Sequence, residues 1–308
     1  MSSQSLGRAE GKTFLITGAS AGIGYFAAEQ LAMRGATVVL GCRDIAKAGV
    51  AIQTIRSRVP DARLRSVQLD LADLSSLSVT VDALGVDRLD AVVLNAGILL
   101  SGAERQVSPQ GYELMFATNY LGHFALVAHL APALAATANS RVITVGSYAA
   151  RTERLDLTDL QSERDYRSKR TYARSKLAQM SFGFELDRRL RARGADTVSV
   201  VVHPGGALDS LTPSRPPLFV RTTAQRLRGL PAGLVLHGKD AGAEAITRAV
   251  LDTQITGGEL WGPRVFGLRG KPHRETPHPH MTDRRGATEL WSATQDFTGH
   301  DPLGRHGY

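Results

Sequence analysis

A tyrosine and a lysine separated by three residues, Tyr172 and Lys176, form the pair in this chain best suited to proton transfer. Side chains at that spacing lie one turn apart on one face of a helix. An unperturbed phenol titrates near pH ~10, and a lysine cation about 4 Å away contributes on the order of 4 kcal/mol toward ionising it. We therefore predict that Lys176 lowers the pKa of Tyr172 and that the pair performs acid–base chemistry. A solvated helix face is the alternative for the pair taken alone.

A glycine-rich segment near the N-terminus is the second chemical signal. The apolar run 13–17 favours a strand, residues 25–33 have helical periodicity, and Gly18, Gly22 and Gly24 lie between them. Such a strand–turn–helix unit binds a pyrophosphate with its backbone N–H groups and helix N-terminus. The glycine spacing differs from the commoner Gly-x-Gly-x-x-Gly, so a plain tight turn is the alternative.

The end of the next expected strand, residues 37–40, bears on the choice of dinucleotide. Arg43 can pair with the 2′-phosphate of NADP, whereas an acidic residue there would bind the ribose hydroxyls of NAD. Asp44 follows at once and is better placed to cap the following helix. We expect NADP(H) to be preferred and NAD(H) to be an alternative.

The chain continues to alternate between short strands and helices. Three further strands and one long helix are expected, at residues 64–69, 91–94, 141–145 and 112–134. This alternation predicts a parallel, doubly wound α/β sheet, whose ligand lies beyond the carboxyl ends of the strands. Asn95 and Ser147 follow two of these strands and are therefore expected to converge.

Several motifs in this order resemble the short-chain dehydrogenase/reductase family. The resemblance covers roughly residues 11–270 and rests on segments 17–24 and 95–97, Asn119, Ser147, Tyr172 with Lys176, and Pro204 with Gly205. Segments 116–124 and 185–190 and the wide separation of Ser147 from Tyr172 are most similar to the branch of retinol-dehydrogenase-like and WW-domain-oxidoreductase-like proteins. Bacterial members of that branch include ketoreductases acting on aromatic polyketides.

The resemblance implies a single Rossmann-type domain with a mostly parallel, seven-stranded sheet flanked by helices. We expect a flexible N-terminus over residues 1–10 and an NADP-binding catalytic domain over residues 11–270. Within the domain, a substrate lid is expected after the sixth strand, at about residues 209–236. Residues 271–308 would form a C-terminal extension.

The family's catalytic tetrad falls on Asn119, Ser147, Tyr172 and Lys176. Tyr172 would exchange a proton with the substrate oxygen, and Ser147 would hydrogen-bond the same oxygen. Lys176 would also bind the nicotinamide ribose, and Asn119 would support a water chain reaching Lys176. A strand-end hydroxyl for Ser147 and a structural buried amide for Asn119 are the alternatives. Cofactor contacts carry over to Gly18, Ser20, Gly22, Ile23, Gly24, Arg43, Asp70, Leu71, Asn95, Gly97, Tyr172, Lys176, Pro204 and Gly205.

One position departs from the family pattern. Four residues after Gly205 the family has a threonine that contacts the cofactor carboxamide, whereas this chain has Asp209. The carboxylate can accept a hydrogen bond from the carboxamide, but it adds negative charge near the pyrophosphate. We expect Asp209→Thr to tighten NADPH binding.

Composition limits the other function classes. The 37 basic and 29 acidic residues give a net charge of +8. The arginine clusters lack interleaved aromatic residues, so we favour a solvated face that attracts an anionic cofactor over nucleic-acid binding. The Pro/His segment 272–280 favours a surface loop over a metal site, and no metal is expected.

The expected location is the cytoplasm. The first ten residues are polar and small, which is unlike a secretory signal, and no run of about 18 apolar residues predicts a membrane span. Cys42 is the single cysteine, so an internal disulfide is impossible and a reducing compartment is compatible.

Two segments are expected to bind the substrate. The lid is rich in proline and apolar residues, and segment 258–266 would give the last strand and an aromatic wall with Trp261. Tyr148 and His203 are further candidates for that wall. Both segments favour a bulky, apolar substrate; core packing of Leu218, Phe219 and Trp261 is the alternative.

Taken together, the sequence predicts an NADP-dependent short-chain oxidoreductase, a ketoreductase of secondary metabolism. It would reduce a ketone or aldehyde of a bulky hydrophobic or aromatic substrate, with Tyr172 as general acid. An oxidative alcohol dehydrogenase or epimerase on a similar substrate, a non-catalytic NADP-binding sensor and a nucleic-acid scaffold are the alternatives. The helix expected over residues 171–193 either pairs with a second subunit in a homo-oligomer or faces only the sheet.

Overall fold

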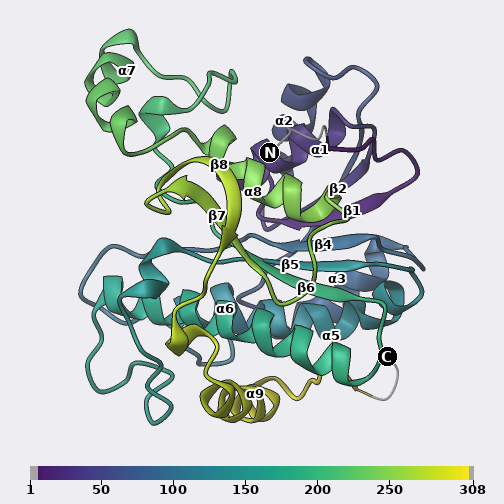
Figure 1. Ribbon diagram of the computed structural model, residues 1–308, viewed down its shortest axis with the longest axis vertical. Helices are drawn as coiled ribbons and strands as arrows, with labels where there is room; N and C mark the ends of the chain where they lie inside the picture. The colour runs from purple at the N-terminus through teal and green to yellow at the C-terminus, as the bar shows by residue number, and fades with distance from the viewer. Residues whose placement is uncertain (1–5, 305–308) are drawn as a thin grey trace.

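The computed structural model describes residues 6–304, and its strands form one eight-stranded sheet in the order β3-β2-β1-β4-β5-β6-β7-β8 (Figure 1). Strands β1 to β7 are parallel, and β8 is antiparallel to β7. The strands are β1 (Thr13–Thr17), β2 (Thr37–Cys42), β3 (Arg63–Gln68), β4 (Ala91–Leu94), β5 (Arg141–Val145), β6 (Val198–Val202), β7 (Leu260–Val265) and β8 (Arg269–Glu275). The strand order reverses between β1 and β4, so the crevice at their carboxyl ends is the place for a ligand.

Helices cover both faces of the sheet (Figure 1). On one face lie α1 (Gly22–Ala32), α2 (Ile45–Arg56) and α8 (Lys239–Leu251). On the other lie α3 (Leu77–Leu84), α5 (Gly122–Ala135) and α6 (Ser168–Ala192), with α9 (Arg284–Thr298) packed outside α6. Each face buries its own apolar core, because parallel strands covered on both sides carry apolar residues in both directions.

The helix expected over residues 112–134 is interrupted. It consists of the short α4 (Leu114–Phe116), a π-helical turn η2 (Ala117–Leu121) and α5. Asn119 lies in the π turn, where the helix accommodates an extra residue. Periodicity in the sequence predicted the helix but not this turn.

The seven parallel strands agree with the predicted fold, but the sheet has an additional edge strand. Strand β8 runs across the boundary expected at residue 270, and it contains Pro272 and His273, which were expected in a surface loop. Strand β8 contains a proline and several charged residues, so it lacks the apolar pattern of a buried strand. Both residue types are compatible with the edge of a sheet.

Within the described residues 6–304, the segments near both ends of the chain pack against the domain. Residues 1–5 of the segment expected to be flexible lie outside the described residues, whereas Ala9 is buried and its N–H donates to the carbonyl of Arg34 at 2.8 Å. In the expected C-terminal extension, Trp291 of α9 is 1% exposed and packs against Phe124 and Phe182.

One helical segment of the described residues, Leu114–Ala135, is long and apolar enough to cross a membrane, with a mean hydropathy of 1.2. In the fold, 78% of its apolar window is buried. This is the environment of a core helix packed on the sheet.

Candidate functional site

The glycine turn between β1 and α1 forms a cradle for a phosphate group. Gly18 and Gly22 have φ values of +68° and +61°, which favour glycine. A Cβ on Gly24 would lie 2.5 Å from Asn95 Nδ2 and 2.7 Å from the Gly18 carbonyl oxygen. Helix α1 starts without a side-chain cap or an acidic residue in its first turn, so its N–H groups are available to an anion. These residues fit the pyrophosphate of a dinucleotide.

Asn95 and Thr17 hold this cradle together. Asn95 Nδ2 donates to the Thr17 carbonyl at 2.8 Å, and Thr17 Oγ1 accepts from the N–H groups of Asn95 and Ala96, each at 2.9 Å. Asn95 and Ser147, which were expected to converge, follow the adjacent strands β4 and β5, and the hydrogen bonds of Asn95 are made to the end of β1.

The end of β2 places Arg43 beside this cradle, with its side chain exposed. Asp44 caps α2, because its Oδ1 accepts from the Lys47 N–H at 3.0 Å, and this bond helps to lower the pKa of its carboxyl group. The capping role weighed for Asp44 is thus the one it has. Arg43 is left as the charged residue that can meet a 2′-phosphate.

The remaining cofactor candidates lie along the same edge of the sheet. Asp70 and Leu71 follow β3, and Asp70 Oδ1 accepts from the Ala72 N–H at 3.0 Å. Gly97 follows β4, and a Cβ on it would lie 3.7 Å from Lys176 Nζ. Gly205 after β6 has φ +67°, and a Cβ there would meet the Leu268 carbonyl at 2.6 Å. Ser20 and Ile23 belong to the glycine turn itself.

Ser147 and Tyr172 meet as predicted. Ser147 follows β5 and caps the 3-10 turn η3 (Tyr148–Arg151), while Tyr172 projects from the first turns of α6. The Ser147 hydroxyl lies close enough to the Tyr172 phenol to lower its pKa. Burial raises the pKa of the Tyr172 phenol, and the Ser147 hydroxyl partly offsets this rise.

Lys176 does not lower the pKa of Tyr172 in this structure, so that expectation is corrected. Lys176 is 4% exposed, and burial lowers its pKa to about 7. Its Nζ donates to the Val145 carbonyl at 2.6 Å and to Gln179 Oε1 at 2.5 Å. Desolvation reduces the charge of the ammonium group and its bonds direct it to the sheet, whereas helical spacing alone had predicted a contact with the phenol.

A buried polar network continues from Lys176 to the glycine cradle. Gln179 Nε2 donates to the Leu94 carbonyl at 2.9 Å and lies 3.1 Å from His123 Nδ1. His123 Nε2 lies 2.9 Å from Thr17 Oγ1, and burial lowers the pKa of His123 to about 3, so the imidazole is neutral. Gln179 and His123 were missed from the sequence, because no local pattern reveals partners that are distant along the chain.

Asn119 connects the loop after β4 to α6. Its Oδ1 accepts from the Ile98 N–H at 2.7 Å, and its Nδ2 donates to the Ile98 carbonyl at 3.0 Å and to Ser175 Oγ at 2.9 Å. Both ends of the amide are engaged within the protein. Asn119 therefore lies beside Lys176 as expected, and its contacts are those of the structural role weighed for it.

His203, expected as part of a substrate wall, belongs to a charged cluster at the end of β6. Glu275 Oε2 of β8 accepts from Arg151 Nη2 at 2.6 Å and lies 3.1 Å from His203 Nε2. The Arg151 guanidinium also stacks on the ring of Tyr148, 4.4 Å from its centroid. Because all these groups are paired with one another, the cluster fixes the segment after Ser147 to the last strand.

The lid segment is attached to the body at its base. Arg215 Nε and Nη2 donate to the Glu29 carboxylate of α1 at 2.7 and 2.9 Å. Phe219 is 8% exposed and packs on Tyr25 and Phe26. Asp209 forms ion pairs with Lys239 and with Arg221, the latter at 2.9 Å.

Two aromatic residues weighed as either substrate contacts or packing residues make packing contacts. Phe219 belongs to the aromatic cluster on α1. Trp261 is half-buried and packs under Arg248 of α8, and its Nε1 donates to Glu259 Oε2 at 2.8 Å. Helix α7 (Thr223–Gly229) extends from the body in Figure 1, and the leucines on and after it are exposed.

An open cleft of about 830 Å³ lies near Ser147 and Tyr172, because its lining includes Ala149, whose N–H donates to Ser147 Oγ, and Ala173, which follows Tyr172. It is lined by the loop after β4, by the segment after Ser147 and by the start of α6: Leu99, Leu100, Ser101, Gly102, Ala149, Thr152, Glu153, Arg167, Ser168, Lys169, Arg170 and Ala173. Its size suits a bulky small molecule.

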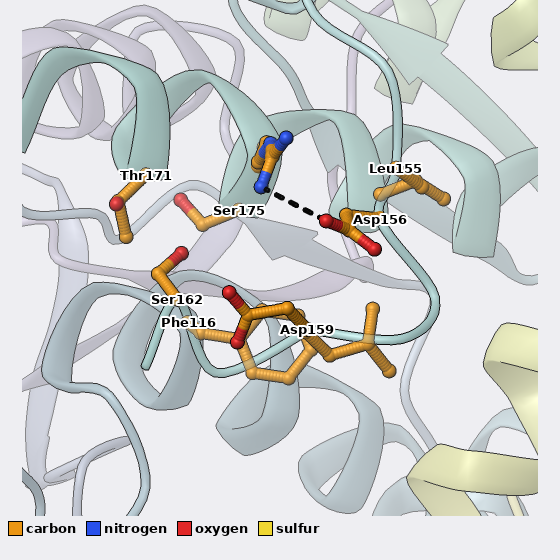
Figure 2. A pocket seen from close by; sticks show the side chains of 9 residues that line it. Phe116, Leu155, Asp156, Asp159, Ser162, Thr171 and Ser175 are labelled. Carbon is orange, nitrogen blue, oxygen red and sulfur yellow. Dashed lines mark ion pairs between the residues drawn. The ribbon is translucent and has the colours of Figure 1, made fainter. Parts of the chain in front are cut away.

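Figure 2 shows a second, much smaller cavity beside the same helix, between Asp156, Asp159 and Ser162 on one side and Thr171 and Ser175 of α6 on the other. Its volume is about 10 Å³, which is roughly the space of one water molecule. It is too small for a substrate. Within residues 6–304, no group of three or more His, Cys, Asp or Glu side chains is arranged to hold a metal ion.

Comparisons with known proteins agree with this arrangement. Residues 12–212 match the family described as short chain dehydrogenase. The chain is 39% identical over 292 residues to retinol dehydrogenase 13 of Mus musculus, covering 94% of this chain and 84% of that protein. Its identity to the Homo sapiens protein of the same name is 32% over 295 residues, covering 94% and 85%. A crystal structure of an uncharacterized protein from Mycobacterium paratuberculosis has a TM-score of 0.78 at 30% identity and covers 98% of both chains.

Proposed function

Because this chain belongs to the short-chain dehydrogenase family, in the branch of the retinol dehydrogenases, we propose that it reduces a ketone or aldehyde on a bulky hydrophobic or aromatic molecule with NADPH. Family membership establishes an NAD(P)-dependent oxidoreductase acting on CH–OH and C=O groups. The preference for NADP(H), the substrate class and the direction form the proposal.

The proximity of the Ser147 hydroxyl to the Tyr172 phenol, near an open cleft, carries this proposal. Burial raises the pKa of Tyr172, so the phenol is protonated near neutral pH and is ready to donate to a carbonyl oxygen. Ser147 can hydrogen-bond and orient the same oxygen. NADPH bound in the cradle would supply the hydride. A protonated acid next to the cleft favours reduction over oxidation.

Arg43 supports the proposed preference for NADP(H). Its guanidinium is exposed at the end of β2, and it makes no ion pair in the described part of the chain. Asp44, the nearest carboxylate in sequence, is occupied as a helix cap. A cation that is free of protein partners can pair with the 2′-phosphate through two charge-assisted hydrogen bonds.

The test is NADPH and NADH oxidation with a panel of aromatic and alicyclic ketones, using wild type, Tyr172→Phe and Arg43→Ala. We expect Tyr172→Phe to lower kcat by about 10²–10⁴-fold. Arg43→Ala should raise KM for NADPH and leave KM for NADH nearly unchanged. Wild-type turnover equal to that of Tyr172→Phe on every ketone contradicts the proposed catalysis. An equal effect of Arg43→Ala on both cofactors contradicts the assigned preference.

Oxidation of an alcohol is the second candidate, and the similarity to retinol dehydrogenase 13 favours it. The same fold would then bind an alcohol, and Tyr172 would accept its proton. All-trans-retinol with NADP⁺ and retinal with NADPH, measured at matched pH, separate the two directions. A kcat/KM for retinol above that for retinal and for every ketone of the panel favours the dehydrogenase.

A further inference from the structure

The walls of the cleft beside Ser147 and Tyr172 combine an apolar floor with a basic rim. Ala149 and Ala173 connect the cleft to the candidate catalytic pair, because Ala149 N–H donates to Ser147 Oγ at 3.2 Å and Ala173 follows Tyr172. Leu99 and Leu100 add apolar surface from the loop after β4, and Leu99 is 57% exposed. A molecule that lies in this cleft meets the reacting groups at one end and aliphatic surface along its body.

The charged residues that line the cleft are mostly basic. Arg167, Lys169 and Arg170 line it from the start of α6, against a single carboxylate, Glu153. Exposed cations on a helix are usually solvated and carry no function. Here, however, they surround a concave surface next to the candidate catalytic residues, where a substrate must pass or bind.

The ion pairs of this rim leave one cation without a carboxylate partner. Asp165 Oδ1 accepts from Arg167 at 3.2 Å, and Asp165 Oδ2 lies 2.7 Å from Arg170 Nη2. Glu153 lies 3.8 Å from Arg174. Lys169 makes no ion pair among residues 6–304, and its side chain is exposed. The positive charge of Lys169 is therefore available to a ligand.

We propose that the substrate is a carbonyl compound that also carries a carboxylate, with Lys169 binding that carboxylate at the rim of the cleft. The inference rests on the proposed function, since it assigns the far end of the same substrate. Lys169 and Tyr172 lie three residues apart on α6 and therefore share one face of the helix. A substrate whose carbonyl meets Tyr172 can place a carboxylate at the other end of its body near Lys169. A single unpaired cation matches a monoanion.

Matched probes that differ only in charge test this assignment. Para-acetylbenzoic acid and its methyl ester share the ketone and the ring, but only the acid carries a negative charge at neutral pH. Wild type, Lys169→Glu and Lys12→Glu are compared with NADPH. Lys12 is an exposed lysine directly before β1, at the amino end of the strands and so away from the candidate site. Its variant is a control for the same change in net charge.

We expect wild type to prefer the acid, and Lys169→Glu to lower the acid-to-ester ratio of kcat/KM by about fivefold or more, since a repulsion replaces an exposed ion pair. Lys12→Glu should leave both rates and their ratio unchanged. A ratio in Lys169→Glu equal to that of wild type, or a wild-type preference for the ester, overturns the carboxylate site but leaves the proposed reductase in place.

If neither probe is reduced while other ketones are, calorimetric titration of the acid into the NADPH complex decides the site. Binding that Lys169→Glu weakens and Lys12→Glu does not supports it, and no binding overturns it. If no ketone is reduced at all, the proposed function fails, and the same titration still reports on Lys169 separately.

Discussion

Two regions of the molecule are built in opposite ways. In the buried polar network behind the candidate site, Lys176, Gln179 and His123 are at most 4% exposed and are connected by hydrogen bonds from α6 to the glycine cradle. In the lid, Leu230 and Leu234 are 60% and 78% exposed. The lid is attached at its base by an ion pair and an aromatic cluster.

Because of this difference, the two regions tolerate substitution unequally. A substitution in the buried polar network leaves a buried polar group without its partner, at about 1–3 kcal/mol for each group. Exposed apolar residues of the lid impose no comparable cost, so the lid tolerates substitution more readily than the network.

The largest effect is expected from Lys176→Met on the pH dependence of stability. The pKa of Lys176 is lowered from its ordinary value to about 7, so between pH 7 and about 10 the unfolded chain binds a proton that the folded chain lacks. Wild-type stability should gain up to about 1.4 kcal/mol per pH unit across that window from this group. The stability of wild type relative to Lys176→Met should therefore rise as the pH increases from 7 toward 10.

Urea denaturation of the cofactor-free protein at several pH values measures this difference, and Lys12→Met is the control for loss of an exposed lysine. If the difference in free energy of unfolding between wild type and Lys176→Met stays constant across the window, Lys176 is not held desolvated in the buried polar network.

An intermediate effect is expected where the lid is attached. Arg215→Met removes two bonds from the buried Glu29 carboxylate, which keeps an ion pair with Arg58 at 3.1 Å. The loss should be about 1–3 kcal/mol, below the 3–5 kcal/mol for stranding a buried charge completely. Limited proteolysis should cut the lid faster in Arg215→Met, and Arg228→Met, an exposed lid arginine, should match wild type. Identical cleavage of all three proteins would place the lid attachment elsewhere.

The smallest effect is expected from Asp209→Thr at the start of the lid. The Asp209 carboxylate is already offset by Lys239 and Arg221, so its removal changes the field at the cradle only modestly. We expect NADPH to bind more tightly by less than about tenfold, or about 1.4 kcal/mol. Fluorescence titration measures the dissociation constant, and Asp209→Asn separates the loss of charge from the gain of a hydroxyl. Weaker binding in both variants contradicts the expected repulsion.

The sequence predicted the features that depend on local patterns. Segments 13–17, 91–94 and 141–145 are strands with the predicted bounds, because buried parallel strands are short apolar runs. The glycine turn was predicted for the same reason, since it follows a parallel strand at the ligand-binding edge. The meeting of Ser147 with Tyr172 was implied by the resemblance to the family's tetrad.

Features set by contacts between distant residues were not predictable. Strand β8 carries proline and charge, so only its pairing with β7 defines it. The direction of Lys176 depends on Gln179 and Val145, which helical spacing does not reveal. The sequence around Phe219 is compatible with a lid residue and with a core residue, and only its contacts with α1 distinguish them.

The core is complete only when helix α9, near the end of the chain, has packed onto it. Trp291 closes over Phe124 and Phe182, which lie more than a hundred residues earlier in the sequence. During synthesis, those two aromatic side chains stay uncovered until α9 has left the ribosome. A chain truncated before residue 284 would therefore contain every candidate catalytic residue and still be prone to aggregate, because its aromatic core stays exposed.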